Sequence, residues 1–127
     1  MSRPRIRSLK PESWQDERIG ALSRDARLLW VGLITLADDE GRFRALPSVI
    51  LGHVFPYDAD AGRRLGKWMA ELENLGLVCL YEHRGTRYGA LPKFTQHQKI
   101  NRAKPSLLPD PSVNGHGVIT EGSVTNA

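Results

Sequence analysis

Residues 61–91 read AGRRLGKWMAELENLGLVCLYEHRGTRYGAL, and two different spacings of apolar residues follow each other in this stretch. In residues 61–74 the apolar side chains recur every three or four positions, the period of an amphipathic helix. From residue 78 to residue 91 the pattern becomes an alternation around Arg84-Gly85, which predicts a β-hairpin that turns at this pair. Gly76 lies between the two patterns and is typical of the end of a helix.

Two further helices are predicted upstream. Residues 24–37 have Ser23 as a helix-capping residue and apolar side chains at helical spacing. Residues 47–55 fit a two-turn helix that begins at Pro47 and stops before Pro56, and a short strand at residues 43–45 precedes it. The order helix, strand, helix, helix, strand, turn, strand predicts an α+β fold, the winged helix-turn-helix. This fold has a three-helix core and a C-terminal β-hairpin wing.

The length of 127 residues predicts one domain with flanking segments. Residues 1–10 form a basic N-terminal arm, and residues 11–98 form the winged-helix domain. Residues 99–127 are rich in Pro, Gly, Ser, Thr and Asn and hold no aromatic residue, so we expect a largely disordered tail. Within the tail, Leu107-Leu108 is the part that could dock on the domain.

Composition excludes several classes of protein. No run of 18 apolar residues exists and no apolar segment follows the basic start, so we expect neither a membrane helix nor a signal peptide but a cytoplasmic protein. Cys79 is expected to be a buried, inert thiol, and the four histidines have no metal-like spacing. The acidic run Asp38-Asp39-Glu40 is interpreted as a turn before Gly41. We therefore expect no enzymatic activity, no metal and no cofactor.

Positive charge is concentrated in one part of the chain. Residues 63–104 contain nine Lys and Arg against three Glu, a net charge of +6, whereas the whole chain carries +4. In a winged helix the third helix enters the major groove of DNA. Arg63, Arg64 and Lys67 lie on the polar side of that helix, where they would contact guanine edges or phosphates. The plain alternative is an ordinary solvated helix face.

Three more basic segments are candidate contacts to double-stranded DNA. The hairpin turn offers its cations to a minor groove or a pair of phosphates, although hairpin tips are polar in most proteins. The arm and the base of the tail would add mobile phosphate contacts, although the arm could instead be a strand that packs Ile6 and Leu9 on the domain. The candidate residues are Arg84 and Arg87 in the turn, Arg3, Arg5 and Arg7 in the arm, and Lys99, Arg102 and Lys104 in the tail.

Several motifs resemble small phage and prophage proteins of actinobacteria. Residues 6–14, IRSLKPESW, are similar to the start IRTIKPEFW of many of these proteins, and residues 26–33 and 37–42, ARLLWVGL and ADDEGR, resemble their central helix and acidic turn. Residues 54–56, 72–78 and 94–102 continue the likeness, which covers about residues 5–109. The resemblance implies a winged-helix fold and DNA binding in phage DNA replication or transcriptional regulation, in a bacterial host cell and associated with its nucleoid.

Two other functions stay open. A protein-interaction module in a phage replication or host-takeover assembly would bind replication or transcription proteins, and it would expose an apolar patch on the third helix or around Trp14. A binder of RNA or single-stranded DNA would expose Tyr81 or Tyr88 for stacking on bases. The sequence shows no clear dimer seam, so the oligomeric state is open, and no membrane partner is expected.

Overall fold

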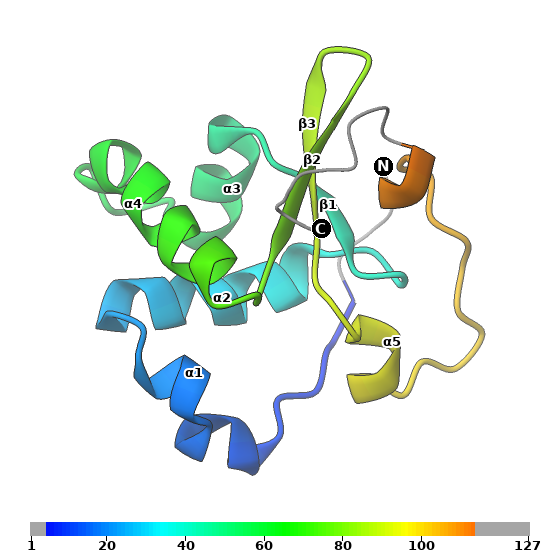
Figure 1. The fold of residues 1–127 in the computed structure, drawn as a ribbon, viewed down its shortest axis with the longest axis horizontal. Coiled ribbons are helices and arrows are strands. Elements are labelled where there is room, and N and C mark those ends of the chain that lie inside the picture. The colour runs from blue at the N-terminus through cyan, green and yellow to red at the C-terminus, as the bar shows by residue number, and fades with distance from the viewer. Residues whose placement is uncertain (1–4, 114–127) are drawn as a thin grey trace.

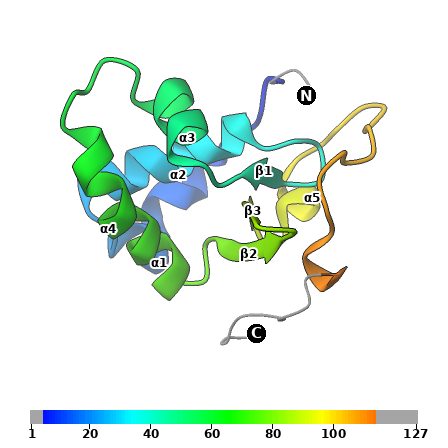
Figure 2. The same ribbon diagram turned by 90° about the horizontal axis from the view of Figure 1, so that it is seen from above.

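The computed structural model describes residues 5–113 of the chain (Figure 1). The protein is α+β, with α1 to α4 gathered on one side of a small antiparallel sheet (Figure 2). The helices are η1 (Pro11–Gln15), α1 (Glu17–Gly20), α2 (Arg24–Leu36), α3 (Pro47–Val54), α4 (Ala61–Asn74), α5 (Phe94–His97) and η2 (Pro111–Val113). The strands are β1 (Arg42–Arg44), β2 (Cys79–His83) and β3 (Thr86–Ala90).

The long helices begin where their local sequence predicts. The Ser23 hydroxyl accepts a hydrogen bond from the Ala26 N–H and caps α2. Helix α4 has the predicted bounds and buries its apolar stripe against α2 and α3. Phe55, which follows α3, packs on Trp68 of α4 with 5.0 Å between the ring centroids. The three helices therefore share one core, as the spacing of their apolar residues predicts.

The sheet has the strand order β1-β3-β2, and its register separates two faces. Phe43 and Leu80 both lie opposite Gly89, and the Phe43 ring lies where a Cβ on Gly89 would be. Because side chains directly opposite each other share a face, these residues define the inner face toward the helices. On the outer face Tyr81 pairs with Tyr88, and their rings stack at 5.7 Å between centroids.

Cys79 is exposed, so the prediction of a buried thiol is wrong. It pairs with Ala90 at the start of β2, on the outer face of the sheet. The core residues beside it are Leu77 and Val78, which precede the strand. Alternation along β2 then turns Leu80 toward the helices and Cys79 away from them.

The short helices α1 and α5 lie outside the elements that the sequence predicts. Asp16 caps α1, because its carboxylate accepts hydrogen bonds from the N–H groups of Arg18 and Ile19. Helix α5 follows Lys93, whose backbone is left-handed, and buries Phe94. Each segment has four residues, which is too short for a 3.6-residue period to show in the sequence.

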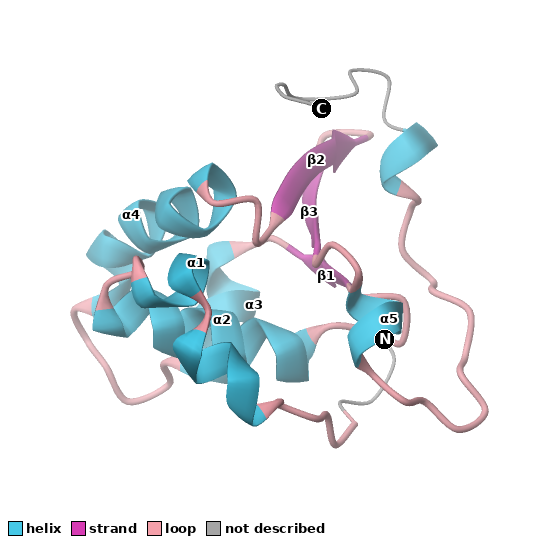
Figure 3. Ribbon diagram, turned by 60° about the horizontal axis from the view of Figure 1, so that its bottom comes forward, coloured by secondary structure: helices cyan, strands magenta, loops and turns pink. Residues whose placement is uncertain are grey.

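The structure differs from the predicted tail, because residues 99–113 are attached to the domain. Ile100 packs against the core, and the segment after it runs past the sheet (Figure 3) with hydrogen bonds to Asp39 in the acidic turn and to Tyr81. Leu107 is exposed and Leu108 is only half-buried, so polar contacts hold the segment more than apolar burial does. Composition misses such contacts. Residues 1–4 of the predicted arm and 114–127 of the predicted tail lie outside the described residues.

Candidate nucleic-acid interface

The outward side of α4 carries three adjacent stripes of residues. The first stripe contains Gly62, Gly66 and Ala70, and the second contains Arg63 and Lys67, all of them exposed. The third contains Arg64 and Glu71. Residues three or four positions apart are neighbours on a helix surface, so the second stripe lies between the other two. Arg63 and Lys67 therefore point away from the core that the opposite side of α4 buries.

A hollow of about 310 Å³ separates the first stripe of α4 from the sheet. The exposed residues of its helical wall are Gly62, Gly66, Ala70 and the acidic Glu73, and the sheet contributes Leu80 and Arg87. Arg87 shares the inner face of the sheet with Leu80, because the register places Glu82 opposite Arg87 and Gly89 opposite Leu80. The fold thus brings Arg87 to the same hollow that α4 borders.

The two arginines of α4 have different surroundings. Arg64 forms an ion pair with Asp60, one turn earlier, with 3.2 Å between Nε and the carboxylate. Glu71, on the same stripe, accepts hydrogen bonds from the N–H and hydroxyl of Ser23, and these bonds hold the pKa of Glu71 below its ordinary value. Arg64 is therefore paired with an acid, and Glu71 contacts the start of α2 and lies within reach of the charge of Lys67. Arg63 lies next to the hollow.

Arg84 occupies a backbone conformation that is unusual for its residue type. Arg84 and Gly85 both have positive φ, 51° and 79°, and they form the two-residue connection between His83 and Thr86. Two positive φ values define a type I′ turn, where Asn-Gly or Gly-Gly is the common pair. Arginine at the first position costs about 1 kcal/mol relative to glycine. The conformation places an exposed cation at the tip of the hairpin.

In the described part of the N-terminal arm, Arg5 and Arg7 are not the mobile cations that the sequence predicts. The Arg7 side chain is 3% exposed, and its Nη2 lies 2.9 Å from the Asp39 carboxylate and donates to the carbonyl of Ala37. The guanidinium also lies over the Phe94 ring at 5.1 Å. Arg5 reaches the same carboxylate at 2.6 Å and is 38% exposed. Arg7 is therefore part of the buried structure, and Arg5 is held in an ion pair with Asp39. Arg3 lies outside the described residues.

The basic residues at the base of the tail are exposed but lie far from α4. In three views the segment after α5 runs along the side of the molecule opposite α4 (Figures 1, 2 and 3). This segment carries Lys99, Arg102 and Lys104. The predicted cationic surface is thus divided: Arg63, Lys67 and Arg87 border or line one region, and the tail cations occupy another.

The acidic turn has a larger role than the sequence indicates. Asp39 holds Arg5 and Arg7 and accepts a hydrogen bond from the Lys104 N–H at 3.0 Å. Burial raises the pKa of Asp39, but these hydrogen bonds and the charge of Arg5 outweigh burial and leave the pKa below its ordinary value of 3.8. Both terminal segments are therefore fastened at one carboxylate. The local sequence showed only a turn, because the partners lie 32 or more positions away.

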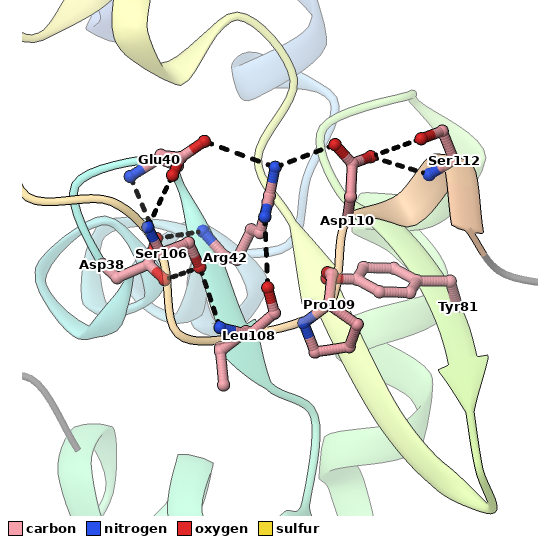
Figure 4. A network of polar contacts seen from close by, with 9 residues as sticks. All are labelled: Asp38, Glu40, Arg42, Tyr81, Ser106, Leu108, Pro109, Asp110 and Ser112. Atoms are coloured by element: carbon pink, nitrogen blue, oxygen red, sulfur yellow. Dashed lines mark hydrogen bonds and ion pairs between the residues drawn. The ribbon is translucent and has the colours of Figure 1, made fainter.

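The neighbours of Asp39 bind the C-terminal segment as well (Figure 4). Ser106 donates its hydroxyl to Asp38 and its N–H to Glu40. Arg42 donates to the carbonyl of Leu108 at 3.1 Å and pairs with Glu40 and with Asp110 at 3.3 Å. The Tyr81 hydroxyl donates to the Pro109 carbonyl at 2.8 Å, and burial raises the pKa of Tyr81. This segment therefore contacts the outer face of the sheet at Arg42 and Tyr81.

Sequence reasoning also missed Tyr57, which is 96% exposed in the connection between α3 and α4. Its neighbours Asp58 and Asp60 add negative charge at that end of α4. No periodic pattern marks a single aromatic residue in a connecting loop, so only the structure identifies Tyr57 as solvent-facing.

Comparison with models of protein families, with curated proteins and with solved structures found no match for this chain. Among the helices of residues 5–113, none has the length and apolar character needed to cross a bilayer. In the same residues no three His, Cys, Asp or Glu side chains are grouped so that they would hold a metal ion.

Proposed function

We propose that this chain is a non-enzymatic winged-helix protein that binds double-stranded DNA through α4 and the β2–β3 hairpin. Helix α4 occupies the major groove, and the hairpin lies along the flanking backbone or minor groove. The observation that carries the proposal is the hollow between the two elements, with Arg87 on the sheet wall and exposed Arg63 and Lys67 beside the helical wall.

The residues of α4 suit this role. Gly66 has open space around the position of a Cβ, so packing within the protein does not require a glycine there. Glycine inside a helix costs about 0.5–1 kcal/mol relative to alanine. A DNA backbone that approaches the helix closely gives the glycine a purpose. Arg84 at the hairpin tip is a second position where the residue present is not the one that would most favour folding, and here the residue is a cation.

The rival functions receive less support from the described residues. The exposed side of α4 carries glycines, an alanine, cations and Glu73, and no large apolar side chain, so it lacks the patch that a protein-docking helix would present. Tyr81 and Tyr88 are buried and stack on each other, so their rings are not available to stack on the bases of RNA or single-stranded DNA. Trp14 is 58% exposed and is the feature that most favours a protein partner.

The biological setting of the proposal comes from the resemblance to phage and prophage proteins. In that setting the protein acts in phage DNA replication or transcriptional regulation, in the cytoplasm of the bacterial host and on its nucleoid. Replication or transcription proteins are then further partners. These parts of the proposal are separate from the DNA contact and are tested separately, by recovering the phage and host DNA fragments that the protein binds.

The DNA contact is tested by fluorescence anisotropy with a labelled duplex at several salt concentrations. Four phosphate contacts, from Arg63, Lys67, Arg84 and Arg87, predict that log affinity falls against log salt with a slope of about −3 to −4. Lys99→Ala is the matched control, because it removes the same charge from the opposite side of the molecule. Binding that ignores salt, or equal weakening by Arg63→Ala and Lys99→Ala, would refute the proposed surface.

A further inference from the structure

A cavity of about 270 Å³ lies among the N-terminal segment, α1, α2 and α5, away from the α4 hollow. Its lining is largely apolar and includes Trp30, Ile34, Leu77, Leu91 and Phe94. An apolar cavity of about 150 Å³ accommodates benzene, so this volume suits a body of two fused aromatic rings. Trp30 is half-buried and lines the cavity, where its ring can pack against a planar ligand.

Hydrogen bonds and an ion pair hold the N-terminal wall of the cavity in place. Ser8 and Gln98 exchange two hydrogen bonds of 2.8 Å, from the Ser8 N–H to the amide oxygen and from the amide nitrogen to the Ser8 carbonyl. These bonds fasten the N-terminal wall to the residue after α5. The neighbouring Arg7–Asp39 ion pair fixes the same segment. The pocket is therefore preformed, which lowers the entropy cost of binding a ligand.

The rim of the cavity is positively charged. Lys10, Arg18 and Lys93 contribute cations, and His97 adds an imidazole. The acidic residue of the lining is Asp16, and its carboxylate is already engaged by two N–H groups of α1 and by Arg18 at 3.7 Å. Arg18 and Asp16 thus offset each other, and an anionic group on the ligand meets the charges of Lys10 and Lys93.

Lys93 adds an independent observation. Its φ is 59° and its ψ is 21°, in the left-handed region that glycine and asparagine adopt more readily than lysine. Strained backbone in non-glycine residues clusters at functional sites. Here the strain places a lysine at the rim of an apolar pocket.

We propose that this cavity binds a small planar aromatic carboxylate, with the rings on Trp30 and Phe94 and the carboxylate at Lys93. This inference does not depend on DNA binding. The lining also includes Gly76 and Leu77 after α4, and Leu91 and Pro92 after β3. A ligand in the cavity therefore touches the chain at the ends of both elements of the proposed DNA surface.

The test is a titration of the isotopically labelled full chain with 1-naphthoate, followed by NMR. We expect saturable shifts at the Trp30 indole N–H and the Leu77 amide, with a Kd of about 1 mM, as suits a ligand of this size. The uncharged analogue 1-naphthalenemethanol should bind about fivefold more weakly, since it lacks the carboxylate. No saturation at about 10 mM, tenfold above the expected Kd, or equal binding of the two compounds, would overturn the proposal.

Two variants locate the charge contact. Lys93→Gly removes the cation and suits the left-handed backbone, so the fold is kept, and we expect about fivefold weaker binding of 1-naphthoate. Lys99→Gly removes the same charge from an exposed position outside the lining and should leave binding unchanged. Equal weakening by both variants would overturn the assignment. An acidic peptide with one tryptophan that displaces 1-naphthoate at a lower concentration would overturn it too, in favour of a protein partner.

Discussion

Arg7 and Asp39 form an ion pair in which the side chains are 3% and 4% exposed, although 32 positions separate them in the sequence. The pair joins the N-terminal segment to the turn between α2 and β1, and the same carboxylate holds the C-terminal segment through the Lys104 N–H. One buried carboxylate thus connects three parts of the chain. Its loss should affect the whole fold rather than one element.

Arg7→Ala leaves the Asp39 carboxylate with an incomplete set of partners in a buried position. Removing one partner of a buried ion pair costs about 3–5 kcal/mol, so we expect a large decrease in the free energy of unfolding by urea. Arg5→Ala is the control, because Arg5 pairs with the same carboxylate but is 38% exposed and should cost less than about 1 kcal/mol. Equal losses in the two variants would contradict the role given to burial.

Acid should destabilise the protein partly through Asp39. The fold holds the pKa of this carboxyl below the ordinary value of 3.8. The ionised form therefore stabilises the native state, and this stabilisation is fully present when the pH is above the pKa of the carboxyl in the unfolded chain. The stabilisation is lost as the pH falls through the lower, folded-state pKa. Urea denaturation between about pH 7 and pH 2 should therefore show a flatter acid limb in Asp39→Asn than in the parent. Parallel acid limbs would contradict this linkage.

Arg63 and Arg64 should differ in DNA binding, although they are adjacent in sequence. Arg63→Ala should weaken binding by about 1–3 kcal/mol if the side chain reads a base. Arg64→Ala should cost less, because Arg64 pairs with Asp60. Anisotropy titrations of both variants at one salt concentration give the comparison. A larger loss from Arg64→Ala would place the DNA on the other side of α4.

Arg84→Asn separates folding from binding at the hairpin tip. Asparagine tolerates positive φ better than arginine, so we expect the free energy of unfolding to rise by up to about 1 kcal/mol. DNA affinity should fall at the same time, because the exposed cation is lost. Thermal unfolding and anisotropy on the same samples give both values. A variant that is more stable and binds as well as the parent would remove the hairpin tip from the interface.

Gly66→Ala separates folding from DNA binding in α4. Alanine favours the helix by about 0.5–1 kcal/mol, and the position has no neighbour within 4 Å to oppose a methyl group. We expect higher stability together with weaker DNA binding, since the methyl group projects toward the approaching backbone. Gly52→Ala in α3 is the control: it also meets no neighbour, and it should stabilise without changing DNA affinity.

Local sequence was sufficient for the elements that form the core. The bounds of α4, the Ser23 cap of α2 and the turn at Arg84-Gly85 follow from spacing and residue type, because each depends on contacts within a few positions. The same information predicted that α4 and the hairpin carry cations. It could not separate Arg63 from Arg64, since their difference depends on the register of α4 against α2 and the sheet.

The amino-acid sequence by itself determined the three long helices, the hairpin and the excess of positive charge, because propensity and apolar period act over short distances. Only the tertiary structure decided which cations are available. It buried Arg7 on Asp39, turned Cys79 outward and placed the segment after α5, which carries Lys99, on the side opposite α4. The physical reason is that burial and ion pairing depend on residues far apart in the chain, and no local pattern records which of them meet.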